Sequence, residues 1–215
     1  MTQDIAVLTG DFVASTSAEP QAVDRAMAAL VAASDILSGW IGSDTRFTRF
    51  RGDGWQICLM RPNFTLRATL FLIAALRAAD TGLETRLSIA IAPYSHLGGA
   101  GLAAASGPAF VLSGHQLDEM SRADRFNFVA DQKEPASWQK AVWQRAVLAL
   151  AFHQARSWTR EQAEAATFAL MPFRPTQEQI AEKLGVTRQA VQARLRGAGI
   201  PAIFDALSVF EMETP

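Results

Sequence analysis

Two aspartates near the start of the chain are spaced so that they could hold a metal ion. Asp11 comes shortly after the apolar run 5–8, and Asp53 lies in a Gly-Asp-Gly turn between the strand-like runs 45–50 and 55–59. If the first strand lies beside that hairpin, the two carboxylates face each other across adjacent strands. Paired carboxylates, completed by phosphate oxygens and water, suit Mg²⁺. The spacing therefore predicts a magnesium site, with a helix cap at Asp11 and a plain turn at Asp53 as the structural alternative.

Polar residues after Asp11 extend this hypothesis to a phosphate group. Ser15 and Thr16 are expected to open the first helix, where free backbone N–H groups can hold an anion. The other common catalytic patterns are missing from the sequence: there is no P-loop, Rossmann fingerprint or Gly-x-Ser-x-Gly elbow, and the three histidines are scattered. The single Cys58 excludes a disulfide framework and a cysteine-based zinc site, and fits a reducing cytoplasm.

The segment 176–197 has the pattern of a DNA-binding helix-turn-helix. Thr176 with Gln179 forms a capping box, Gly185 stands where the turn between two helices needs positive φ, and Thr187 caps the second helix. The outer face of that second helix carries the residues that we predict to contact DNA, since Arg and Gln can read guanine, adenine and phosphate; they are Thr187, Arg188, Gln189, Gln192 and Arg196. The alternative is an ordinary helical hairpin with a solvated face.

Composition is that of a globular protein. Half of the 215 residues (49%) are hydrophobic, which is enough for a sizeable core, and 19% are charged. The net charge of −1 excludes a basic nucleic-acid coat, although arginine outnumbers lysine by 17 to 3. No apolar stretch is long enough to span a bilayer, so we expect a cytoplasmic protein without a membrane partner.

The predicted elements form an α+β sandwich followed by helices. The order β-α-β-β-α-β is typical of a ferredoxin-like or palm fold, and everything after the polar segment at Pro135 has helical periodicity. We therefore predict a palm domain at 1–133 and an all-α helix-turn-helix domain at 134–215, with the apolar helices before residue 172 packing a core or forming a homodimer. Strands are expected at 5–8, 45–50, 55–59, 85–92 and 126–130, and helices at 20–41, 64–79, 107–121, 136–157, 159–171 and 202–212.

Three short segments resemble class III nucleotide cyclases. Thr9-Gly10-Asp11-Phe12 is similar to their first metal-binding segment, Arg51-Gly52-Asp53-Gly54 to their second, and Gly107-Pro108-Ala109 to the segment before their catalytic helix. The bacterial SatD family is a closer likeness and covers nearly the whole chain, because it adds a Gly-Asp-x-aromatic-Gln hairpin and a C-terminal helix-turn-helix. The resemblance implies a nucleotide-cyclase-like palm with a nucleotide ligand, in which Arg49 takes the base-selecting position.

Departures from the cyclase pattern argue against catalysis. The cyclase resemblance puts Val111 where a transition-state Asn would stand, and His115 or Gln116 where an Arg would stand. Loss of a cation that stabilises developing charge costs orders of magnitude in rate. We therefore predict a DNA-binding regulator whose degenerate palm senses a ligand or drives dimerisation. A divergent metal-dependent cyclase or phosphoryl-transfer enzyme and a protein-interaction module with a vestigial helix-turn-helix remain the alternatives.

Overall fold

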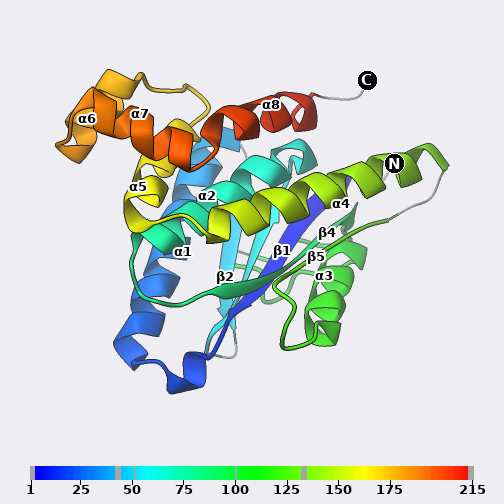
Figure 1. The fold of residues 1–215 in the computed structure, drawn as a ribbon. Helices are drawn as coiled ribbons and strands as arrows, with labels where there is room; N and C mark the ends of the chain where they lie inside the picture. The colour runs from blue at the N-terminus through cyan, green and yellow to red at the C-terminus, as the bar shows by residue number, and fades with distance from the viewer. Residues whose placement is uncertain (1–2, 42–44, 51, 100, 132–134, 213–215) are drawn as a thin grey trace.

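The computed structural model describes residues 3–41, 45–50, 52–99, 101–131 and 135–212. Within these ranges the chain forms a mixed α+β fold around one five-stranded sheet (Figure 1). The strands are β1 (Asp4–Phe12), β2 (Arg46–Phe50), β3 (Gly54–Leu59), β4 (Thr85–Pro93) and β5 (Phe126–Ala130). The helices are α1 (Pro20–Ile41), α2 (Thr65–Ala78), α3 (Pro108–Glu119), α4 (Pro135–Arg156), α5 (Arg160–Ala169), α6 (Gln177–Leu184), α7 (Arg188–Gly197) and α8 (Ile200–Phe210).

The strand order across the sheet is β2-β3-β1-β4-β5, so β1 is central. It pairs antiparallel with β3 and β4, while β5 runs parallel to β4. The expected placement of the β2–β3 hairpin beside β1 is correct, and Asp11 lies opposite Gly54 in the register. None of the helices in the described ranges is both long and apolar enough to cross a membrane.

Alternation along β1 divides the two faces of the sheet. Ala6, Leu8 and Phe12 face the layer that contains α1 and α2, and they belong to the main hydrophobic cluster. Ile5 and Val7 face the other way and pack with Ala109 and Phe110 of α3. Further along β1, the residues on the face of the sheet that α3 covers are polar: they are Thr9 and Asp11.

Helix α2 is buried on every side. All residues from Thr65 to Ala74 are buried, the polar Thr65, Arg67 and Thr69 among them. The cause is a further layer, because α4 and α5 pack over the side of α2 that faces away from the sheet. Arg67 reaches across this contact and binds Glu211, just after α8, in a bidentate pair at 2.5 and 2.9 Å, and it also donates to the Leu170 carbonyl at 2.7 Å.

The two predicted domains share one hydrophobic cluster. It contains Leu8 and Phe71 from the first and Phe152, Trp158 and Leu207 from the second. The predicted boundary near 133 falls on residues 132–134, which lie outside the described ranges. The division at that point stays a prediction, and the described residues on its two sides are packed together.

Glu84, just before β4, links the sheet to the end of α4. Its carboxylate lies 2.7 Å from Arg156 and 3.6 Å from Arg125. Burial pushes the pKa of Glu84 up, but the hydrogen bonds and positive charges of Arg156 and Arg125 outweigh it, and the pKa is lowered. A carboxyl whose folded pKa lies below its unfolded value stabilises the fold above the unfolded pKa, and this contribution is lost as the pH falls through the folded pKa.

Glu84→Gln is therefore expected to lower the free energy of unfolding at pH 7 by up to about 1 kcal/mol, the range for a partly exposed ion pair. The difference from the wild type should shrink below about pH 4.5, where the unfolded carboxyl takes up its proton. Urea unfolding at pH 7 and about pH 3.5 measures both values. Exposed Glu19→Gln is the control, and an equal effect of the two substitutions at pH 7 would contradict the assignment.

Candidate functional site

A cluster of charged residues occupies the polar end of the α3 face. Asp11 of β1 lies directly opposite Arg86 of β4 in the strand register. The two side chains form a bidentate pair, with Nε–Oδ1 at 2.9 Å and Nη2–Oδ2 at 2.5 Å. The hydrogen bond and charge of Asp11, together with the charges of Asp118 and Asp53, outweigh burial and raise the pKa of Arg86. Asp11 thus binds the guanidinium directly, while Asp118 and Asp53 act on it through their charges.

Ser15 joins the cluster through Asp53. Its hydroxyl donates a short hydrogen bond to Oδ2 of Asp53. The sequence predicted that Ser15 and Thr16 open the first long helix, but they lie in a three-residue 3₁₀ turn, and α1 begins only at Pro20. Such a short turn does not offer the row of free N–H groups that a phosphate needs, and the Thr16 side chain is exposed.

The close approach of the Trp55 ring to β1 explains why the Thr9-Gly10-Asp11 segment has a glycine. A Cβ added there would lie 2.5 Å from the ring of buried Trp55 and 2.7 Å from the carbonyl oxygen of Arg86. Only glycine lets β1 pass this close to the indole, which in turn is fixed by a 3.2 Å hydrogen bond to Thr85. The segment is therefore required for packing as well as for placing Asp11.

The Asp11 and Asp53 carboxylates are already engaged by other side chains in this structure. Both Asp11 oxygens accept hydrogen bonds from Arg86, and one Asp53 oxygen accepts from Ser15. Among the described residues no group of three His, Cys, Asp or Glu side chains has a metal-binding arrangement. Magnesium at Asp11 and Asp53 stays a prediction, and the guanidinium of Arg86 supplies the positive charge that a cation would bring to these carboxylates.

Arg86→Met is accordingly expected to create divalent-ion binding, because both Asp11 oxygens then lose their hydrogen-bond donor and can coordinate an ion together with water. Electron paramagnetic resonance of Mn²⁺ should detect binding with a dissociation constant below about 1 mM in Arg86→Met, a binding free energy on the order of 4 kcal/mol, and weaker binding in the wild type. Adding Asp11→Asn should abolish it, and exposed Arg122→Met is the matched control. Equal binding by Arg86→Met and Arg122→Met would show that Arg86 does not stand in for a metal.

A cleft of about 300 Å³ adjoins the carboxylate cluster. Two of its lining residues begin a chain of hydrogen bonds that leads into the interior: Gln56 donates to Thr9 at 2.9 Å, Thr9 to buried Ser113 at 2.8 Å, and Ser113 to the Phe110 carbonyl. The cleft has polar and apolar walls and is large enough for a small organic ligand. Its lining residues are Thr9, Thr48, Phe50, Gln56, Leu102, Ala103, Gly114, Leu117 and Asp118.

The loop after β4 forms one wall of this cleft. The sequence of residues 93–106 is rich in Gly, Ala and Ser, which is typical of a loop. Arg46 of β2 donates to the carbonyls of Leu97 and Gly98, the amide of Leu102 donates to Thr48 at 2.7 Å, and His96 forms a bridge with Ser106. These contacts fix the described part of the loop against β2.

The other residues singled out by the cyclase resemblance lie outside the carboxylate cluster. Arg49 pairs with Asp24 of α1 at 3.0 Å, so it lies on the opposite side of the sheet from Asp11 and does not join the cleft. Val111 is 67% exposed on α3, and His115 is exposed. Arg51, the first residue of the Arg51-Gly52-Asp53-Gly54 segment, lies outside the described residues.

Sequence reasoning missed Arg86 and Asp118. The pattern of β4 contained the signal for Arg86, because Arg86 and Ser88 alternate with apolar Leu87 and Ile89. That alternation puts Arg86 on the same face of the sheet as Asp11 once β4 pairs with β1. Asp118 carried no such signal, because its approach depends on how α3 packs on the sheet.

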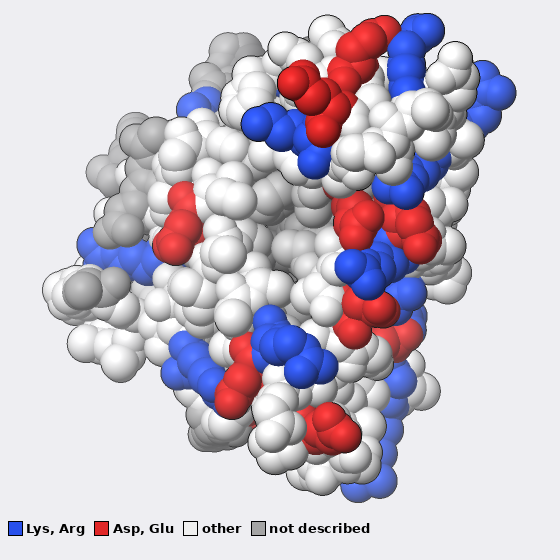
Figure 2. Space-filling view, turned by 90° about the vertical axis from the view of Figure 1, so that its left-hand side faces the viewer, with Lys and Arg blue, Asp and Glu red and all other residues white. Residues whose placement is uncertain are grey.

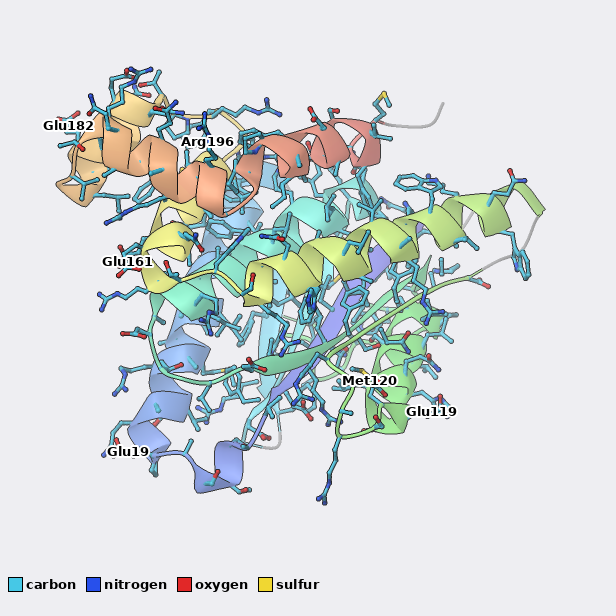
Figure 3. All side chains as sticks on the ribbon, viewed as in Figure 1. Glu19, Glu119, Met120, Glu161, Glu182 and Arg196 are labelled. Atoms are coloured by element: carbon cyan, nitrogen blue, oxygen red, sulfur yellow. The ribbon has the colours of Figure 1, made fainter. Side chains whose placement is uncertain are left out.

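The second candidate site is the outer surface of α6 and α7, at the far end of the molecule. Figure 3 shows Arg196 on α7 and Met120 at the end of α3 on opposite sides of the fold; the Met120 carbonyl accepts from Arg86 at 3.3 Å. The predicted capping box is confirmed, because Thr176 and Gln179 bond reciprocally. Gly185 has the expected left-handed backbone with φ 65°, and Thr187 caps α7 through the amide of Ala190.

All five residues that we predicted to contact DNA are exposed: Thr187, Arg188, Gln189, Gln192 and Arg196. The opposite side of α7 is anchored, with Val191 and Leu195 buried and Arg194 lying 3.7 Å from Glu164 of α5. Buried Trp158 donates to the Ala198 carbonyl at 2.8 Å and ties the end of α7 to the start of α5. The helix therefore presents its polar face on a rigid support.

Acidic side chains accompany the arginines of this surface. Arg188 lies 2.7 Å from Glu178 at the start of α6, and both side chains are largely exposed. A hydrogen bond from its own backbone amide, then Thr176 and the charge of Arg188, lower the pKa of Glu178. Figure 2 shows the same mixture over the neighbouring face, where basic and acidic groups alternate and no patch of one sign forms.

No family model, curated protein or solved structure matches this chain.

Proposed function

We propose that this protein is a DNA-binding regulator in which α6 and α7 form a helix-turn-helix and α7 enters the major groove. The observation that carries the proposal is the exposed polar face of α7. Arg188, Gln189 and Gln192 lie in its first half, which is the part of a recognition helix that contacts base edges. The apolar side of the same helix is buried, so this face is the one available to a duplex.

The role proposed for the N-terminal part is ligand sensing by a degenerate palm. The strand order β2-β3-β1-β4 follows the ferredoxin-like pattern, which supports the likeness to the SatD family and to cyclases. The cleft beside Asp118 has room for a nucleotide-type ligand, and its Phe50 and Gln56 suit a base. Because Arg86 engages the Asp11 carboxylate, binding without catalysis is the role that this geometry favours.

Selection of bound fragments from genomic DNA with the purified full chain tests the proposal. Bound fragments should share a sequence, and their affinity measured by gel shift should fall steeply between about 50 and 200 mM salt, as phosphate contacts require. An absence of any salt-dependent binding would overturn it. Repeating the shift with ATP and GTP then tests the palm: a change in operator affinity supports a sensor.

A further inference from the structure

A second cavity lies at the end of the sheet that is opposite to Asp11. Its volume is about 500 Å³, and its walls come from the start of β1, the ends of β3, β4 and β5, and the helices α4 and α8 (Figure 1). Asp4 of β1 lines this cavity, whereas Asp11 is seven residues further along the same strand, about 23 Å away. The cavity is therefore separate from the cleft beside Asp118.

Gln144 of α4 gives this cavity a buried polar group without a partner. The residue is 6% exposed, it lines the cavity, and its side-chain amide forms no hydrogen bond with any of the described residues. A buried amide without a hydrogen bond destabilises a fold, so packing alone would favour an apolar residue at this position. The structure thus leaves the Gln144 amide available to a molecule in the cavity.

The chemistry of that amide selects what can pair with it. Its oxygen accepts and its nitrogen donates, side by side. A ligand that uses both atoms must carry a donor next to an acceptor, and the adenine edge with N6 and N7 is the pattern that glutamine binds in this bidentate way.

The apolar walls suit the ring of such a ligand. Met60 after β3 and Met212 after α8 line the cavity, and methionine sulfur makes favourable contacts with aromatic rings. Phe210 of α8 adds an aromatic wall. It is held in place by an edge-to-face contact with Trp143 of α4, with ring centroids 5.4 Å apart.

Charge around the cavity favours a neutral ligand over a phosphorylated one. The charged side chains among the described lining residues are two acidic and two basic, so their formal charges cancel; they are Asp4, Asp131, Arg61 and Lys140. A phosphate group would meet carboxylates as well as cations here, and it would gain little from such a balanced rim. The volume is within the range of sites for small organic molecules.

We propose that this cavity binds adenine or an uncharged adenine nucleoside, with the base paired to the Gln144 amide and its ring against Met60, Met212 and Phe210. The site is a second ligand site of the chain, additional to the cleft beside Asp118.

NMR of the full chain with ¹³C-labelled methionine methyl groups tests the site, with adenosine as the probe. Adenosine should shift the Met60 and Met212 signals along a saturating curve with a dissociation constant below about 1 mM. Met120, two residues after Asp118, reports separately on the other cleft. Single Met→Leu variants assign the signals. No saturating shift of Met60 and Met212, or a shift of Met120 alone, would overturn the proposal.

Two glutamines of α4 form a matched pair of variants. Gln144→Leu should weaken adenosine binding about 10-fold, because the bidentate pair is lost, whereas exposed Gln139→Leu should bind like the wild type. Equal affinities of the two variants would overturn the pairing.

Stability of the same variant without ligand is a second measurement. The urea midpoint of Gln144→Leu should equal or exceed that of the wild type, because the variant removes an unpaired buried amide. A lower midpoint would mean that Gln144 supports the fold and would overturn its assignment to a ligand.

Adenosine monophosphate tests the expected charge of the ligand. It should bind no more tightly than adenosine, and clearly tighter binding would overturn the assignment of an uncharged ligand. None of these measurements includes DNA, so their failure is distinct from a failure of DNA binding.

Discussion

Replacing Arg67 with methionine is expected to lower the free energy of unfolding by about 2–4 kcal/mol, because it breaks a buried ion pair. The Arg67 side chain is 4% exposed and makes three hydrogen bonds, two to the Glu211 carboxylate and one to the Leu170 carbonyl. Methionine fills similar space but leaves Glu211, which is 22% exposed, without its counter-charge. Urea or guanidinium unfolding monitored by circular dichroism measures the loss.

Two further variants separate this ion pair from a general effect of removing an arginine. Exposed Arg25→Met on α1 should change stability by less than about 0.5 kcal/mol. The double variant Arg67→Met with Glu211→Leu should regain part of the stability, since an apolar pair in place of a buried ion pair is often neutral. If Arg67→Met destabilises no more than Arg25→Met, then this pair does not hold α8 to α2.

Removal of Arg188 and Arg196 together is expected to weaken specific DNA binding strongly. One bidentate arginine contact to a base contributes about 1–3 kcal/mol, and an arginine that neutralises a phosphate strengthens binding to all sequences. The double alanine variant should therefore bind its selected fragment at least about 100-fold more weakly, a change of about 2.7 kcal/mol. Its slope of log affinity against log salt should also fall by about one for each phosphate that the protein no longer neutralises. Both residues are exposed, so folding should be unchanged.

The ion pair at the start of α6 gives a test in the opposite direction. Glu178 competes with DNA for the guanidinium of Arg188, from 2.7 Å away. Glu178→Gln should therefore raise affinity several-fold at low salt, and the gain should shrink as salt screens the exposed charges. The matched control is Glu161→Gln at the start of α5, which removes the same charge from a position whose neighbouring arginines, Arg160 and Arg194, are not predicted contact residues. A decrease in affinity for Glu178→Gln would contradict the proposed orientation of α7.

Much of the fold could be predicted because local signals and tertiary packing agree. Alternation and apolar runs located all five strands of the described sheet to within a few residues, and the Thr176 box and Gly185 fixed the limits of α6. Helix α2 shows where this reasoning fails. Its residue range was predicted from the sequence, but its burial on all sides depends on α4 and α5, and the sequence of a helix does not say what will pack over it.

The palm site was predicted only in part, because pairing partners come from distant strands. Asp11 and Asp53 do lie at the same end of the sheet, as expected from the hairpin beside β1. Residue types alone do not reveal whether a metal ion or an arginine will bind a given carboxylate. The β1–β4 register decides between them, because it places Arg86 directly opposite Asp11.

The burial of α2 on all sides has a consequence for how the chain melts. Sheet, α2 and outer helices share a single apolar interior, so calorimetry should record one endothermic peak for the whole molecule. A fragment ending near residue 133 would expose to water the side of α2 that α4 and α5 cover, and should aggregate. If ligand binding in the cleft changes DNA binding by α7, the change must therefore be transmitted through this packed interior and not through a flexible hinge.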